Sequence, residues 1–375
     1  MGNRRGAVMQ MDDAFRDGAG KRSADPRRHE AFPGPGGVNA PVAVADTLRA
    51  RSHRAMGTEF AVYLDAADDA QAQACFDIVL DEIDRLELTF SRFHSSSELS
   101  RLNRHAAEGP VVTDPEVFQL LASALDVSEK TGGAFDITVG QLTRSWGFAE
   151  RQPRIPEARE LAAAREQVGW RNVKLDAAWR TVLFARPGLQ LDLGAIAKGY
   201  AVDRAIEMLR SVGVSALVDA GSSSMAATGE AFVSGWKVSI ASPVDRALTI
   251  CEVELGKRAL STSGVREQSF VHDGRTYSHL LDPRDTDPLN SATGAQATAR
   301  QVLQVTVLAP SSMLADALST AMFVLGYEHG SAALAQFTDC SALWIYSGAD
   351  GITCLGHRWP GDDFLSLNTA THGQT

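Results

Sequence analysis

The chain has 375 residues, 44% hydrophobic and 22% charged, which is enough to bury a large core as one large domain or two smaller ones. Its formal net charge of -10 disfavours a protein that binds the nucleic-acid backbone, because such a protein needs a basic surface. No apolar run approaches the ~20 residues of a membrane helix, and a structural zinc site is disfavoured because the cysteines are widely spaced, at Cys75, Cys251, Cys340 and Cys354.

The two ends of the chain differ in composition from its middle. Residues 1–52 contain a Gly/Pro-rich stretch and two arginine pairs but no hydrophobic periodicity, which predicts a disordered tail. They show neither the apolar segment of a secretory signal nor an early cysteine for a lipid anchor, which favours a cytoplasmic protein. We therefore expect one catalytic domain over 53–360 and a flexible tail over 361–375.

Between these ends, predicted strands and helices mix without a strict βαβ rhythm, which favours an α+β fold of mixed sheets with packed helices. The helices are expected at 68–88, from Pro115 to the Gly132-Gly133 stop, at 195–212, and at 313–326. The strands are expected at 59–64, 181–184 paired with 189–193, 216–218, 236–240, 249–253, 303–308 and 343–346.

Residues 192–203 form a predicted strand, turn and helix start. Gly194 permits a tight turn after Asp192, and a helix N-terminus attracts anions, to which Lys198 adds a positive charge. The GxxxxGK[ST] spacing of a phosphate-binding P-loop is absent. The alternative is an ordinary strand–turn–helix with a solvated lysine.

Two later stretches carry further polar groups. His279, three residues before Asp282, is either a phosphate ligand or proton carrier, or a histidine hydrogen-bonded at a strand edge. Asp316 and Thr320 lie one turn apart on an otherwise apolar helix, and their oxygens suit Mg²⁺. The alternative for Asp316 is a partner for the helix dipole.

Two earlier stretches are weaker signals. Phe93 and the polar run 97–103 could hold a flat ring, or Ser97 could simply cap a short helix. The glycines before 134–136 could allow backbone to approach a ligand, or could end a helix.

In this order, the motifs resemble the ApbE family of flavin transferases, the FAD:protein FMN transferases. The resemblance covers roughly residues 56–326 and implies one large domain of two closely packed lobes. The stretches that carry it are 56–58, 97–103, 133–136, 192–203, 262–264, 277–283 and 315–320.

The resemblance implies an enzyme that transfers the FMN moiety of FAD to a Thr or Ser hydroxyl of an acceptor flavoprotein and releases AMP. It places Mg²⁺, or Mn²⁺ instead, on the backbone carbonyl of Ala195 and the side chains of Asp316 and Thr320. His279 and Asp316 are the candidate bases, and His279 is favoured because a metal-bound carboxylate is a poor base. The implied contacts to FAD are Met56, Phe93, Asn103, Ala134, Phe135, Asp136, Asp192, Lys198 and Leu280.

Two departures from the family pattern bear on these expectations. The loop 221–224 reads Gly-Ser-Ser-Ser, where relatives commonly have Gly-Gly and an acidic or amide residue. The segment 285–288 lacks the usual glycine, and 290–300 looks extended, so this loop could face the acceptor protein.

The residues leave three functions open. Asn103 matches the transferase-type asparagine and favours transfer over Mg²⁺-dependent hydrolysis of FAD to FMN and AMP. The serine-rich loop motivates the third possibility, a protein that binds FAD without turnover. Many members of the family act on the periplasmic side of the inner membrane, which is the alternative to the cytoplasm.

Overall fold

The computed structural model describes residues 47–229, 235–265, 269–285, 288–291, 301–348 and 351–360, all within the unit Gly34–Thr375. The expected tail residues 1–46 and 361–375 lie outside this part of the chain. Residues 48–52, assigned to the tail from composition, instead belong to strand β1 (Leu48–Ala55). Hydrophobic periodicity did not reveal this strand because one of its faces is polar. On that face, Arg49 and His53 pair with carboxylates of the first helix instead of packing in a core.

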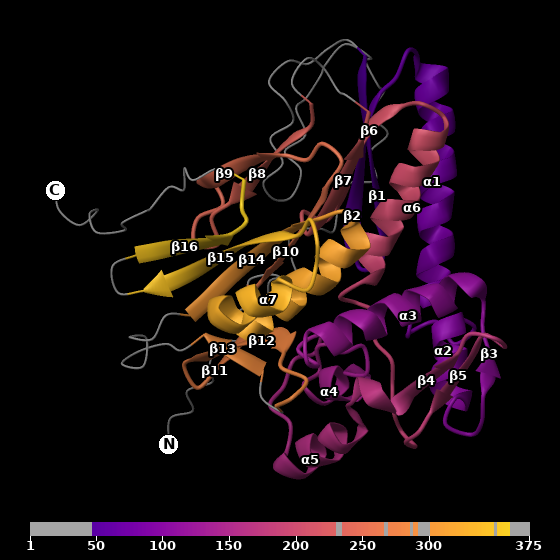
Figure 1. The fold of residues 1–375 in the computed structure, drawn as a ribbon, viewed down its shortest axis with the longest axis vertical. Coiled ribbons are helices and arrows are strands. Elements are labelled where there is room, and N and C mark those ends of the chain that lie inside the picture. The colour runs from indigo at the N-terminus through magenta and orange to yellow at the C-terminus, as the bar shows by residue number, and fades with distance from the viewer. Residues whose placement is uncertain are drawn as a thin grey trace, which may run out of the picture. The chain divides into compact units, whose positions relative to one another are not determined.

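An eight-stranded antiparallel sheet organises the fold (Figure 1). Its strand order is β1-β2-β6-β7-β10-β14-β15-β16. After β1, the strands are β2 (Thr58–Asp65), β6 (Ser215–Ala220), β7 (Ser224–Thr228), β10 (Ala259–Gly264), β14 (Gln301–Ala309), β15 (Ser341–Gly348) and β16 (Gly351–His357).

The central strands of this sheet are buried on both faces and carry apolar residues on both sides. Val305 and Val307 of β14 pack on the helical side, in one core with α1 (Asp69–Phe90), α6 (Ala197–Ser211) and α7 (Ser312–Leu334). Leu308, on the opposite face of the same strand, belongs to a second core with the hairpin β8 (Lys237–Ala241) and β9 (Thr249–Glu254). The period-2 alternation of side chains in a strand produces this division.

The segment between α1 and α6 builds a second, mostly helical lobe (Figure 1). Its short strands pair in the order β3-β5-β4. Its elements are α2 (Glu98–His105), β3 (Val111–Val112), α3 (Pro115–Lys130), α4 (Gly140–Ser145), α5 (Ala158–Gln167), η1 (Trp170–Asn172), β4 (Val173–Asp176) and β5 (Thr181–Phe184). A third sheet joins β11 (Ser269–His272), β12 (Arg275–Leu281) and β13 (Pro288–Ser291).

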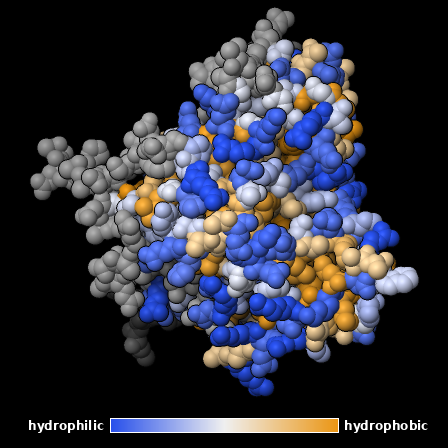
Figure 2. All heavy atoms as spheres, viewed as in Figure 1, coloured by the Kyte–Doolittle hydropathy of each residue, from blue (hydrophilic) through white to orange (hydrophobic). Residues whose placement is uncertain are grey.

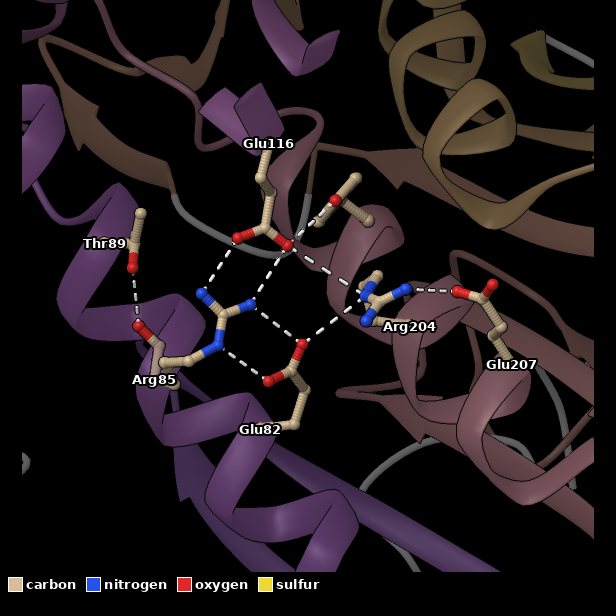
Figure 3. A network of polar contacts seen from close by, with 7 residues as sticks. Glu82, Arg85, Thr89, Glu116, Arg204 and Glu207 are labelled. Carbon is tan, nitrogen blue, oxygen red and sulfur yellow. Dashed lines mark hydrogen bonds and ion pairs between the residues drawn. The ribbon is translucent and has the colours of Figure 1, made fainter. Parts of the chain in front are cut away.

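An ion-pair network connects three of the helices (Figure 3). Arg85 of α1 makes two hydrogen bonds to Glu116 of α3, at 2.8 and 3.0 Å, and also binds Glu82 of its own helix. Arg204 of α6 reaches Glu82, with Nε 3.4 Å from the carboxylate. The Tyr200 hydroxyl, near the start of α6, donates a hydrogen bond to the Glu116 carboxylate. The network therefore holds the first turns of α6 against the other two helices.

The α+β prediction is confirmed, but the pairing of 181–184 with 189–193 was wrong. β5 pairs with β3 and β4, and residues 189–193 form no strand. Their apolar residues alternate because Leu189, Leu191 and Leu193 point into the core. Their backbone groups bond mainly outside any ladder, as when the Asp192 amide donates to the carbonyl of Ile137.

Helix α7 extends beyond its predicted end at Gly326. That glycine has φ 66° and ψ -177°, which interrupts the helix without ending it. The Tyr346 hydroxyl accepts a 2.7 Å hydrogen bond from the amide of Tyr327, next in the chain. Among the described residues, no helix is long and apolar enough to cross a membrane, and polar residues cover much of the face seen in Figure 2.

Candidate functional site

The start of α6 faces the start of α7, and this junction gathers the predicted anion-binding and metal-binding residues. α6 begins at Ala197, two residues after the predicted start. The Lys198 ammonium lies 3.0 Å from the carbonyl oxygen of Gly194 and 3.7 Å from the carboxylate of Asp316. Lys198 is therefore held over the turn and is not a freely solvated side chain.

Asp316 is a buried carboxylate, only 4% exposed, on the face of α7 turned toward α6. Its Oδ2 accepts a 3.1 Å hydrogen bond from the amide of Gly199, and its Oδ1 lies 3.4 Å from the Ser261 hydroxyl. Burial of a charge requires such partners. The Asp316 carboxylate thus meets a helix N-terminus, a lysine and a hydroxyl.

Hydroxyl groups surround the rest of this junction. Ser263 bonds Ser319 at 2.8 Å and Thr320 at 3.3 Å, while Ser261 also bonds Ser224 at 3.1 Å. Ser261 and Ser263 are two apart in β10, so they share one face of the strand. The alternating Ser-Thr-Ser sequence was the available signal for them, but only the fold shows that this face meets α7.

Asp192 is clamped from the helical lobe. Its Oδ2 pairs with Arg92 at 2.9 Å and accepts from Thr143 at 3.3 Å, and its Oδ1 accepts from the Gly194 amide at 2.9 Å. No local spacing connects Arg92 or Thr143 with Asp192, because the three positions are far apart in the chain. The carboxylate is thus fixed and partly neutralised at the mouth of the turn.

Asn103 positions the segment that leads into Asp192. Its side chain donates to the carbonyl of Leu191 at 3.1 Å and accepts from the Leu191 amide at 2.7 Å. Asn103 thereby makes the two backbone hydrogen bonds of Leu191 that a neighbouring strand would otherwise make. Ser97 caps α2, which carries Asn103, by accepting from the Ser100 amide.

The 134–136 segment is buried. Ala134 and Phe135 are 1% and 2% exposed. The Asp136 carboxylate accepts hydrogen bonds from the amide and hydroxyl of Thr138 and from the amide of Trp170. Burial raises its pKa, and these hydrogen bonds oppose that rise. Asp136 therefore holds the turn at Trp170.

Met56 has a strained backbone conformation, and Phe93 has an exposed side chain. Met56 has φ 50°, and its amide donates to Glu87 at 2.9 Å. The Phe93 ring is 68% exposed, with the Arg92 guanidinium 5.0 Å from its centroid. An exposed aromatic ring beside Arg92, and so beside Asp192, is available to stack on a planar ligand.

His279 and Leu280 lie on β12, which packs against α7. Leu280 points into the main core and is 5% exposed. His279 is half-buried and lies where the pairing of β12 with β13 shifts register, between Tyr277 and Leu281. The Tyr277 ring stacks on Trp146 and Phe270 at centroid distances of 5.6 and 5.2 Å, so β12 abuts the helical lobe at Tyr277.

The serine-rich loop adopts a tight, specific conformation. Gly221 and Ser222 both have positive φ, and a Cβ on Gly221 would lie 1.9 Å from the Thr58 hydroxyl. Ser224 reaches the Asp316 site through Ser261. The second departure falls partly outside the described residues, at 286–287 and 292–300.

Sequence reasoning missed Asp219, a buried acid that precedes this loop. Its carboxylate accepts from the Ser222 amide at 2.7 Å. Burial raises its pKa to about 7, and that hydrogen bond only partly opposes the rise. An aspartate within an apolar strand was the available signal.

Comparisons with known proteins agree on one relationship. The model of the ApbE family matches residues 56–344. The FAD:protein FMN transferase of Treponema pallidum is 34% identical over 292 residues, which cover 74% of this chain and 78% of that protein. The corresponding protein of Klebsiella pneumoniae is 30% identical, covering 81% of this chain and 90% of the relative.

Solved structures give the same relationship. The crystal structure of the ApbE protein of Thermotoga maritima has a TM-score of 0.72 at 30% identity, and covers 82% of this chain and 96% of its own. The flavin transferase ApbE of Vibrio cholerae has a TM-score of 0.70 at 30% identity, and covers 83% and 97%.

Proposed function

This chain belongs to the ApbE family, and from that premise we propose that it is an FAD:protein FMN transferase. It transfers the FMN moiety of FAD to a Thr or Ser hydroxyl of an acceptor flavoprotein, with a divalent cation, and releases AMP. The observation that carries the proposal is the junction of α6 and α7, where Lys198 and the Gly199 amide meet the buried Asp316 carboxylate.

The residues at the junction fit a hard divalent cation. Asp316 supplies a buried carboxylate, Thr320 a hydroxyl one turn later, and Ala195 a backbone carbonyl before the helix. These oxygen donors suit Mg²⁺ and also Mn²⁺. When bound, the cation would neutralise pyrophosphate charge and stabilise the departing phosphate.

The same junction offers a place for the pyrophosphate of FAD. The N-terminus of α6 and the Lys198 ammonium supply positive potential. We assign the flavin to Met56 and the exposed Phe93 ring, with only the backbone of Leu280 beside it, because the Leu280 side chain lies in the core. Fixed Asp192 and the backbone of the buried Ala134–Asp136 turn would complete the FAD site.

In the transfer step, the acceptor hydroxyl oxygen bonds to the phosphorus of the FMN half. The bond from that phosphorus to the bridging oxygen breaks, and AMP leaves with that oxygen. We assign the hydroxyl proton to His279, because Asp316 is committed to Lys198, Gly199 and the cation site. Asp316 is the alternative base.

Incubation with FAD and Mg²⁺, with and without an acceptor flavoprotein, tests the proposal. A transferase releases AMP with the acceptor present and leaves flavin fluorescence on the denatured acceptor. AMP release without an acceptor and without covalent flavin would instead identify the alternative, an FAD pyrophosphatase. FAD binding without AMP under either condition would identify a non-catalytic FAD-binding protein.

A further inference from the structure

Helices α6 and α7 each supply a carboxylate that binds backbone amides at the start of the other helix. Asp203 of α6 accepts hydrogen bonds from the amides of Ser312 and Met313, at 2.7 and 2.8 Å. Asp316 of α7 accepts from the amide of Gly199, in the first turn of α6, at 3.1 Å. The first amides of a helix have no partner within the helix, so each helix supplies a carboxylate to the start of the other.

Backbone contact makes this junction stiff. A Cβ on Gly199 would lie 2.3 Å from the carbonyl oxygen of Ser312, so the two helices touch at a position that only glycine allows. Ser312 and Asp316 are one turn apart on α7, and Gly199 and Asp203 are one turn apart on α6. The two cross-helix links therefore bracket one turn of each helix.

We propose that Asp203 is a positioning residue for the metal site. It fixes the first turn of α7 against α6, and so sets where Asp316 and Thr320 lie relative to the carbonyl of Ala195. This inference rests on the metal site of the proposed function. Partners that orient metal ligands commonly affect metal affinity by ~10–100-fold when they are replaced.

A simple capping role is the competing explanation, and the chain contains its control. α7 has its own N-cap, Ser311, whose hydroxyl accepts from the Leu314 amide at 3.2 Å. Ser311 and Asp203 both bind amides of the same turn. Of these two residues, Asp203 connects that turn to α6 and Ser311 does not, so loss of capping and loss of the cross-link can be separated.

The test is Mn²⁺ binding by the full chain without FAD, followed by electron paramagnetic resonance. Asp203→Asn keeps the shape of the side chain but turns an amide group toward one of the two backbone donors. We expect its Mn²⁺ dissociation constant to rise ~10-fold or more, while Ser311→Ala stays within about twofold of wild type. Melting temperatures of both variants show how much stability each loses.

Wild-type Mn²⁺ affinity in a folded Asp203→Asn variant would overturn the proposal, as would an equal loss of affinity in Ser311→Ala. If Asp203→Asn does not fold, Asp203→Glu is measured instead. It keeps both acceptor oxygens but adds a methylene that displaces α7, so weaker Mn²⁺ binding is expected and unchanged binding would overturn the proposal. A wild-type chain that binds no Mn²⁺ would overturn the metal site itself, and this inference with it.

Discussion

Charged side chains at the junction of α6 and α7 are individually restrained, which determines what each can contribute. Lys198 hydrogen-bonds the Gly194 carbonyl and lies near Asp316, so its charge is held where a phosphate would bind. The buried acid Asp219 instead lies in a strand, where its charged form is disfavoured. Substitution of Lys198 should therefore mainly change ligand affinity, whereas substitution of Asp219 should change stability.

Lys198→Ala should weaken FAD binding by about 10- to 150-fold at low salt, because a charge-assisted contact to phosphate contributes on the order of 1.5–3 kcal/mol. Its stability should change less than its FAD affinity, because the Asp316 carboxylate that loses Lys198 keeps its hydrogen bond from the Gly199 amide. Fluorescence titration with FAD measures the affinity. The matched control is Lys174→Ala, an exposed lysine on β4. Equal FAD affinity in the Lys198 variant and the control would place the phosphate elsewhere.

Asp219 should make the free energy of unfolding fall as pH rises. Its pKa is about 7 in the folded chain and about 3.9 when unfolded, so the folded state holds the proton more tightly. The stabilisation is complete below about pH 4 and is lost as pH rises through 7. Asp219→Asn should therefore be more stable than wild type at pH 8, by on the order of 4 kcal/mol, and nearly equal to it in stability at pH 4. Urea unfolding at both pH values measures this difference in the free energy of unfolding. A difference that does not depend on pH would show that Asp219 is not the titrating group.

At the scale of elements, the closest approach in the site is between two helices. Gly199→Ala would force a Cβ against the Ser312 carbonyl and push α7 away from α6. We expect a loss of about 1–3 kcal/mol of stability together with weaker metal binding. Gly109→Ala is the control, since a Cβ there meets nothing within 4 Å. Thermal unfolding of the two variants decides this, and equal melting temperatures would contradict the close approach.

Local pattern was a good guide to elements whose own residues determine them. The helices α1, α3 and α6 follow apolar periodicity, with Pro115 at the start of α3. Lys198 and Asp316, from two separate motifs, lie 3.7 Å apart, and Thr320 follows Asp316 by one helical turn. Pattern failed where the partner was distant: the Leu189–Leu193 alternation looks like a strand, but Asn103 supplies the hydrogen bonds of Leu191. Arg92 and the cross-helix bonds of Asp203 likewise depend on contacts that no local spacing encodes.

At the scale of the whole molecule, we propose that the catalytic unit begins with β1 rather than at residue 53. A chain starting at Thr47 should keep its melting temperature and FAD-dependent AMP release, because residues 1–46 have no apolar periodicity. A chain starting at Met56 removes β1 and exposes the edge of β2, which pairs with β1 over Leu48–Ala55. It should melt well below the longer chain. Equal melting of the two truncations would show that β1 is dispensable.

We propose that this chain attaches FMN to a protein through the junction of α6 and α7. The decisive measurement is mass spectrometry of an acceptor flavoprotein after incubation with FAD and Mg²⁺. We predict that the wild-type chain adds one FMN to a Thr or Ser of the acceptor, and that Asp316→Ala, which loses the buried carboxylate at that junction, adds none at limiting Mg²⁺. An acceptor left unmodified while AMP accumulates, or one modified equally by Asp316→Ala, would show that the chain does not transfer FMN through this junction.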